Sequence, residues 1–226
     1  MKRSQINKYI ADARRFFDSL QFRLPPFADW TPSDWQTKGR DADEIRACQL
    51  GWDVTSFGSD DFLSRGLLLF TLRNGRAGDP SNRKIYAEKI MMVREQQETP
   101  FHFHCQKTED IINRGGGNLV CTLYGSTPDG EFATTPATVW CDGVERTVPP
   151  GGQVILAPGE SITMTPGLYH QFYAQKGAGT AMIGEVSSVN DDAADNRFHV
   201  PLQRFPAIEE DEAPFRLLCN EYSPAR

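Results

Sequence analysis

The stretch Pro100-Phe101-His102-Phe103-His104-Cys105-Gln106-Lys107-Thr108-Glu109 brings two histidines and a carboxylate together within a short span. Alternate side chains of a β-strand point to the same face, so His102 and His104 share one face of a predicted strand. Glu109 follows after a short stretch that can turn back toward that face. A third histidine, His170, comes where a later Pro-Gly turn leads into another predicted strand. Three of the four histidines of the chain therefore fall into one pattern with a glutamate.

Three imidazoles and one carboxylate suit a divalent ion such as manganese, iron, cobalt, nickel or zinc, and an octahedral ion held in this way keeps two positions open. The predicted metal ligands are His102, His104, Glu109 and His170. The alternative is that these histidines are unconnected core or surface residues. The fourth histidine, His199, stands between Phe198 and Val200 and is predicted to be a packed residue rather than a ligand.

The spacing of the predicted ligands resembles that of a known superfamily. His102-x-His104-x4-Glu109-x6-Gly116 resembles the first motif of the cupins, and Pro166-Gly167-x2-His170 resembles the second. Within the cupins, the chain is more closely similar to the D-lyxose isomerases. The stretches that carry this likeness are Tyr86–Lys89, Thr99–Lys107, Glu109–Asn118, Gly184–Asp192 and Leu217–Tyr222. They are scattered along most of the chain, so the resemblance covers nearly all of it.

This resemblance implies a manganese-dependent ketol-isomerase, with other divalent transition metals as possible cofactors. The expected reaction interconverts D-lyxose and D-xylulose, and D-mannose and D-fructose more slowly, through a cis-enediol intermediate. A hydride shift is the alternative route, and the sequence does not separate the two. The resemblance also implies a homodimer.

Short strand signals separated by turn residues fill the middle of the chain. The predicted strands are Asp53–Phe57, Gly66–Arg73, Lys84–Arg94, Phe101–Cys105, Asn118–Tyr124, Thr138–Cys141, Glu145–Val148, Gln153–Ala157, Ser161–Thr165, Gln171–Gln175 and Thr180–Ser188. This pattern indicates a sandwich or jelly roll. Before it, apolar spacing over residues 4–20 predicts a helix with Ser4 as its N-cap, Thr31-Pro32 can begin a short helix, and another is expected near Asp41–Leu50.

The predicted fold class is therefore all-β, a cupin jelly-roll barrel with short N-terminal helices packed outside. We expect residues 1–226 to form a single domain. Within it, residues 1–50 form a helical N-terminal extension, residues 51–200 the β-barrel, and residues 201–226 a C-terminal tail that packs back. The acidic run Glu209–Glu212 is expected to be a solvated loop.

The composition narrows the classes of partner. A net charge of −6 and a pI near 5.3 argue against nucleic acid or an anionic membrane and favour a small neutral molecule, which the resemblance implies is a sugar. No apolar run is long enough to span a bilayer, and the first residues lack the apolar region of a signal peptide, so a cytoplasmic protein is expected. The five cysteines are predicted to be reduced and buried, with Cys105 packed in the core and turned away from the metal.

Three further residues are candidates for the chemistry. Lys107 lies between the paired histidines and Glu109, and Lys89 precedes them by one strand. The resemblance implies that both lysines reach the sugar; the alternative is that they serve surface solubility. Glu185 stands inside an apolar strand, where a carboxylate is costly to bury without a partner. It is the predicted base for proton transfer, and a buried salt bridge to an arginine is the competing role.

Weaker candidates for substrate binding come from the end of the chain. Asp191 and Asp192 follow the strand of Glu185 on a loop that can line the mouth of the site, and Arg216 can bridge to carboxylates there. Glu109 can also touch the substrate while it ligates the metal.

Two other functions compete with the isomerase. A set of three histidines and one glutamate also serves iron- or nickel-dependent dioxygenases on the same fold, and fold does not decide function. Polar side chains near the metal favour a polyol over a flat aromatic substrate. A sugar-binding cupin without catalysis is the second competitor.

Overall fold

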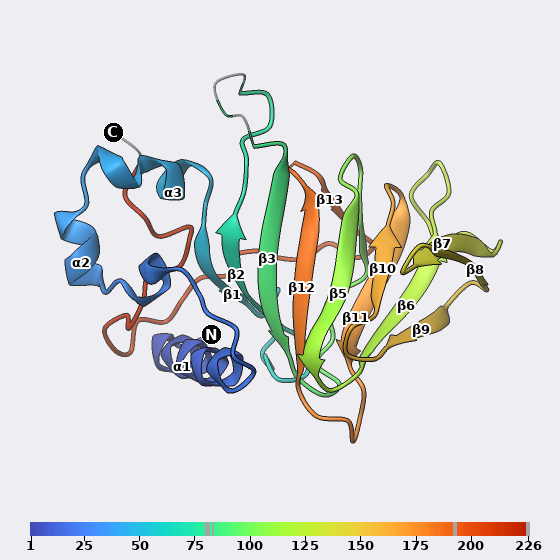
Figure 1. Cartoon of the computed structure of the whole chain (residues 1–226), viewed down its shortest axis with the longest axis horizontal. Helices are drawn as coiled ribbons and strands as arrows, with labels where there is room; N and C mark the ends of the chain where they lie inside the picture. The colour runs from blue at the N-terminus through green and yellow to red at the C-terminus, as the bar shows by residue number, and fades with distance from the viewer. Residues whose placement is uncertain (80–81, 83, 192–193, 225–226) are drawn as a thin grey trace.

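The computed structural model describes residues 1–79, 82, 84–191 and 194–224, and it contains two antiparallel β-sheets (Figure 1). The strands of the larger sheet are β1 (Gly51–Thr55), β2 (Leu67–Arg73), β3 (Tyr86–Val93), β5 (Glu109–Gly116), β7 (Ala137–Cys141), β8 (Val144–Val148), β10 (Ser161–Met164) and β12 (Ala181–Ser188). Those of the smaller sheet are β4 (His102–His104), β6 (Leu119–Gly125), β9 (Gly152–Leu156), β11 (Leu168–Ala174) and β13 (Asn196–Phe198). The strand orders are β1-β2-β3-β12-β5-β10-β7-β8 and β13-β4-β11-β6-β9. The predicted all-β fold of jelly-roll type, with helices outside, is confirmed.

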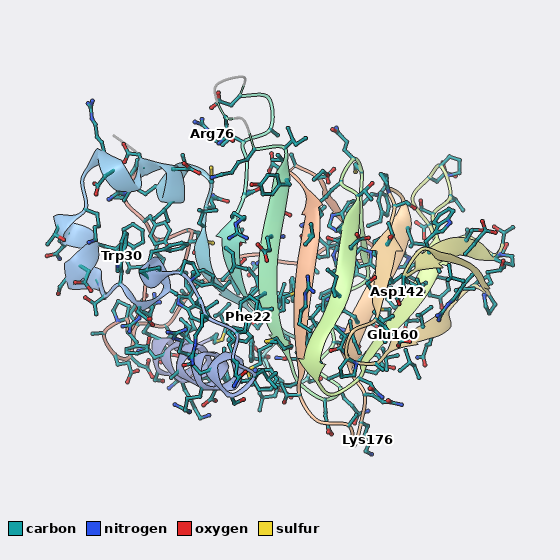
Figure 2. All side chains as sticks on the ribbon, in the orientation of Figure 1. Phe22, Trp30, Arg76, Asp142, Glu160 and Lys176 are labelled. Carbon is teal, nitrogen blue, oxygen red and sulfur yellow. The ribbon has the colours of Figure 1, made fainter. Side chains whose placement is uncertain are left out.

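Two apolar cores lie on opposite faces of the larger sheet. Along β2 and β3, Leu69 and Met91 belong to the core between the sheets, whereas Phe70 and Ile90 belong to the core under the helices. Phe22 packs against this second core at the boundary between helices and strands (Figure 2). The first core leaves space for a cavity between the sheets, and the second attaches the N-terminal segment.

The longest helix, α1 (Arg3–Ser19), buries Ile6, Ile10, Ala13 and Phe17 on one face, as the apolar spacing predicts. Its N-cap is Lys2, so the prediction of Ser4 as the cap is wrong. Ser4 is already inside the first turn, where its Oγ donates to Asp211 Oδ2 at 2.7 Å.

Short helices complete the N-terminal layer. They are η1 (Pro26–Asp29), α2 (Pro32–Thr37), η2 (Arg40–Ala42) and α3 (Asp43–Ala47). Thr31 caps α2, because its Oγ1 accepts from the amide of Asp34 at 3.1 Å, as predicted. The helix expected near Asp41–Leu50 is present only as η2 and α3.

Two strands were not predicted from the sequence, and β5 is the more important one. It contains Asp110, Asn113 and adjacent glycines, which are typical of turns, yet it pairs with both β10 and β12. Asn113 is buried and its Nδ2 donates to the carbonyls of Gly117 and Leu156, both at 2.9 Å. Glu109 is thus the first residue of a central strand and not part of a turn.

The C-terminal tail is largely irregular and lies against the N-terminus. Buried Arg3 donates to Glu210 Oε1 at 2.7 Å and also binds Glu221; we call these three residues the Arg3 clasp. The acidic run Glu209–Glu212 is an exposed loop, as predicted, and it also holds the start of α1 through Arg3 and Ser4.

The five cysteines are all free thiols, and four of them are buried. Cys105 is exposed, so its predicted core position is wrong: it follows β4, where the backbone leaves the sheet. Among the described residues, no helix is long and apolar enough to cross a membrane.

Candidate active site

Three histidines project from two neighbouring strands of the smaller sheet. His102 on β4 stands directly opposite His170 on β11, and their ring centroids are 4.2 Å apart. His104 lies two residues along β4 and therefore faces the same side. One nitrogen from each ring lies within 4.8 Å of the other two, so these atoms can bind a single ion.

Backbone carbonyls fix the tautomers of two of these rings. Nδ1 of His102 is 2.9 Å from the carbonyl oxygen of Pro100, and Nδ1 of His170 is 3.0 Å from that of Leu168. A carbonyl only accepts hydrogen bonds, so each Nδ1 carries the proton and each Nε2 keeps its lone pair. This arrangement orients an imidazole as a metal ligand.

Several imidazole nitrogens of the group are buried but make no hydrogen bond with any described residue. They are Nδ1 and Nε2 of His104 and Nε2 of His170. Leaving such atoms without a partner is costly, and a bound cation would satisfy those that face it. Burial, followed by the neighbouring His170 and His104, lowers the pKa of His102 well below its ordinary value. The histidines therefore fit a divalent metal.

Glu109 approaches the histidines from β5 of the facing sheet. Its Oε1 lies 3.3 Å from Nε2 of both His104 and His170, close to the spacing of about 3 Å between neighbouring ligands of one octahedral ion. Its Oε2 lies 2.6 Å from Lys107 Nζ. Burial alone would raise the pKa of Glu109, but Lys107, and then His104, hold it well below the ordinary value. Glu109 is thus a carboxylate that can complete the donor set.

Two lysines and a second glutamate form a buried cluster beside Glu109. Lys89 faces Glu185 across the β3–β12 pair, and Lys89 Nζ lies 3.1 Å from Glu185 Oε1. Lys107 Nζ donates to the same oxygen at 2.9 Å. The exposed fractions of Lys89, Lys107, Glu109 and Glu185 are only 4%, 3%, 3% and 5%. The competing prediction for Glu185 is a buried salt bridge to an arginine. The ion pairs of Glu185 are instead with Lys89 and Lys107.

His102, His104 and the charged cluster line one cavity between the sheets, whose space of about 480 Å³ includes a part that is open to solvent. Its remaining wall is mostly apolar, with Leu69 and Met91 on one side, and Arg204 as a further cation. A larger and more open cleft lies outside, beside the loop of Arg76, which Figure 2 labels at the upper edge of the molecule. Lys107 borders both spaces, but of the two only the inner cavity is lined by His102 and His104.

The weaker sequence candidates lie elsewhere. Asp191 lines the outer cleft, and its Oδ1 accepts from the amide of Ala194 at 3.2 Å. Asp192 lies outside the described residues. Arg216 lies over the ring of Phe215 and borders a hollow beside α1, so its prediction as a residue of this cavity is wrong: the tail carries it to the helical side of the larger sheet. His199 is packed as predicted, stacked on Phe132 at 3.9 Å.

The structure also brings residues to the site that sequence reasoning missed. Asn190 lies just beyond β12, and its Oδ1 accepts from Lys89 at 2.8 Å and from Lys107 at 3.2 Å. Arg204 comes from the tail and pairs with buried Asp53 on β1. An asparagine in a predicted loop carries no local signal of such contacts; only its closeness in sequence to Glu185 could have drawn attention to it.

Comparison with known proteins places this geometry in a family. The model of the D-lyxose isomerase family matches residues 1–222. The chain belongs to this family. A D-lyxose/D-mannose isomerase of Serratia proteamaculans is 51% identical over 223 residues, covering 98% of both chains. A D-lyxose/D-mannose isomerase of Escherichia coli O157:H7 is 50% identical over 227 residues, covering 100% of both.

Solved structures share the fold. A mutant form of the L-ribose isomerase of Acinetobacter sp. DL28, in complex with L-ribose, superposes with a TM-score of 0.57 at 16% identity, covering 88% of this chain and 92% of the other. The L-ribose isomerase of Cellulomonas parahominis with L-ribose gives the same TM-score at 17% identity and the same coverage. Family membership makes this chain a sugar aldose–ketose isomerase, and the cupin-type fold predicted from the sequence agrees with it.

Proposed function

We propose that this chain interconverts D-lyxose and D-xylulose, and more slowly D-mannose and D-fructose, with Mn²⁺ held by His102, His104, Glu109 and His170. The observation that carries the proposal is that a buried lysine–carboxylate cluster shares one cavity with His102 and His104 of the three-histidine group. The names of the relatives at about half identity support the choice of sugars.

A divalent ion at the histidines would supply Lewis acidity for two adjacent oxygens of the open-chain sugar. The chain itself must then move a proton between C2 and C1. In the proposed cis-enediol route, a base removes the C2 proton of the aldose and returns it to C1, while the hydroxyl proton on O2 passes to O1. The atoms balance without any further reactant.

Glu185 is the proposed base. Its hydrogen bonds from described residues, those of Lys107 and Ser187, both reach Oε1, and so does the ion pair with Lys89. These contacts fix the carboxylate and leave Oε2 for the substrate carbon. A carboxylate held in one orientation spends less entropy in reaching the reacting geometry.

Lys107 is the proposed acid. Its ammonium lies between Glu109 Oε2 and Glu185 Oε1, so it is close both to the metal ligands and to the base. There it donates a hydrogen bond to the substrate oxygen on which negative charge develops. Lys89 and Glu109, which lie on either side of Lys107, are also proposed to contact the sugar.

The helices, sheets and tail are proposed to form one domain. The core under the helices supports this, because Ile6, Phe70 and Leu218 from the three segments pack in it together. The homodimer rests on the resemblance alone, and sedimentation of the purified protein measures it. A cytoplasmic location is proposed from the sequence.

The test is formation of D-xylulose from D-lyxose by protein stripped with a chelator and then refilled with Mn²⁺ or another divalent ion. Turnover should be lost on stripping and restored on refilling. Oxygen uptake is recorded in the same samples, because a dioxygenase would consume oxygen and an isomerase does not. Metal that binds without restoring turnover would refute the proposal. Deuterium from solvent that enters the product at C1 would support the enediol route over a hydride shift, because a hydride shift carries the hydrogen directly from C2 to C1.

A further inference from the structure

The two active-site lysines share two oxygen acceptors, and only one of these belongs to a charged side chain. Glu185 Oε1 lies 3.1 Å from Lys89 Nζ and 2.9 Å from Lys107 Nζ. Asn190 Oδ1 lies 2.8 Å from the first ammonium and 3.2 Å from the second. The two ammonium groups repel each other, and the two shared oxygens hold them together in a buried place.

The backbone of Asn190 is itself anchored by Asn74, which follows β2 and is buried. The amide of Asn190 donates to Asn74 Oδ1 at 3.0 Å, and Asn74 Nδ2 donates back to the carbonyl of Asn190, also at 3.0 Å. Asn74 Oδ1 also accepts from the amide of Gly75 at 2.9 Å. A β-carbon at Gly75 would meet the carbonyl of Lys84 and the side chain of Val189, so only glycine permits this close approach. The segment beyond β12 is thus fixed to the loop after β2.

From these contacts we infer that Asn190 is a positioning residue for the isomerase: its amide oxygen holds Lys89 and Lys107 against Glu185, and Asn74 holds Asn190. The inference rests on the proposed function. A neutral acceptor suits this place, because the cluster already balances two ammonium groups against Glu109 and Glu185. Asn190 therefore adds a hydrogen-bond acceptor without adding charge.

Asn74 contacts the backbone of Asn190, whereas the two lysines contact its side-chain oxygen. Because the two sets of contacts use different atoms, they can be separated by mutation. The contacts between Asn74 and Asn190 involve only backbone atoms of Asn190. Asn190→Ala therefore removes the contacts to the lysines and keeps the hydrogen bonds to Asn74. We expect kcat for D-lyxose to fall about 10- to 100-fold, as for other partners that orient reacting groups, with KM within about threefold. Metal content and the melting temperature should stay at the wild-type values.

Two further variants distinguish positioning from a merely structural role. Asn190→Gln keeps a neutral amide oxygen in the side chain and should restore part of the lost kcat. In a Lys89→Met background, Asn190→Ala should cost several-fold less than in the wild type, because one of the two groups it positions is gone. The control is Asn118→Ala, which removes one partly buried hydrogen bond to Gln175 away from the cavity and should leave kcat unchanged.

The inference fails if Asn190→Ala retains the wild-type kcat, if Asn190→Gln is as slow as Asn190→Ala, or if the loss is the same with and without Lys89. A wild-type protein that does not turn over D-lyxose would instead contradict the proposed function. The two failures are therefore distinguishable.

Discussion

Two of the regions that bury charged side chains, the cavity and the Arg3 clasp, differ in how completely they exclude water. In the cavity, two lysines and two glutamates are all nearly inaccessible and contact one another. In the clasp, Arg3 is buried, but its partner Glu210 keeps 55% of its side chain exposed. The clasp ties both ends of the chain together while one carboxylate remains hydrated.

The difference teaches what each cluster is for. Burying four charges in contact is a poor way to stabilise a fold, because apolar residues of similar volume often do as well or better. Such a cluster beside a cavity therefore points to chemistry, whereas a single buried guanidinium between two distant segments points to architecture. On this basis, substitutions in the cavity should act mainly on activity, and substitutions in the clasp mainly on stability.

The largest expected effect is that of His170→Ala. Removing this imidazole takes one of the three histidines from the four proposed ligands, so metal content should fall to traces and isomerase activity should become undetectable. His199→Ala is the matched control, because His199 stacks on Phe132 outside the cavity and should leave both unchanged. Metal analysis measures the metal content, and an assay of D-xylulose measures the isomerase activity. An active His170→Ala enzyme would contradict the site.

The next effect is that of Lys107→Ala. The metal should remain bound, because the histidines and Glu109 stay in place, but kcat should fall about 100- to 1,000-fold with the loss of the proposed acid. Lys8→Ala, an exposed lysine paired with Asp12 on α1, is the control. A variant that loses the metal together with its activity would show that Lys107 serves the metal site rather than the proton transfer.

A smaller effect, of the opposite kind, is expected for Arg3→Ala. It should lower the free energy of unfolding by about 2 kcal/mol, less than for a fully buried pair because Glu210 is largely hydrated. KM and kcat should not change. Urea unfolding measures the free energy of unfolding. The control is Arg15→Ala, which removes an exposed arginine of the same helix. If Arg3→Ala lowered kcat instead, the division between the two regions would be wrong.

Sequence reasoning succeeded where one strand carries the information. Strand alternation is a local property, so His102 and His104 were placed on one face without knowledge of the fold. The Pro-Gly turn likewise placed His170 near the start of β11. Glu185 was recognised because a carboxylate within an apolar strand stands out in any window of sequence.

Sequence reasoning failed where contacts between residues far apart in the sequence decide the structure. β5 resembles a turn in composition, and only its ladders with β10 and β12 make it a strand. Arg216 was chosen as the arginine of the tail near the site, but the path of the tail brings Arg204 there instead. Asn190 reaches the lysines through the anchor at Asn74, far away in the sequence, and no local pattern predicts such a contact.

The smallest expected effect is a dependence of the clasp on pH. The hydrogen bond from Arg3 is the main reason that the pKa of Glu210 is lowered in the folded protein. A carboxylate with a lowered folded pKa contributes stability above its unfolded pKa, about 4.3, and loses it as the pH falls through the folded value. The stability difference between wild type and Arg3→Ala should therefore be larger at pH 7 than near pH 3. Urea unfolding at both values, with Arg15→Ala as control, measures this difference. An equal difference at both values would mean that Arg3 stabilises the protein through packing of its side chain rather than through its charge.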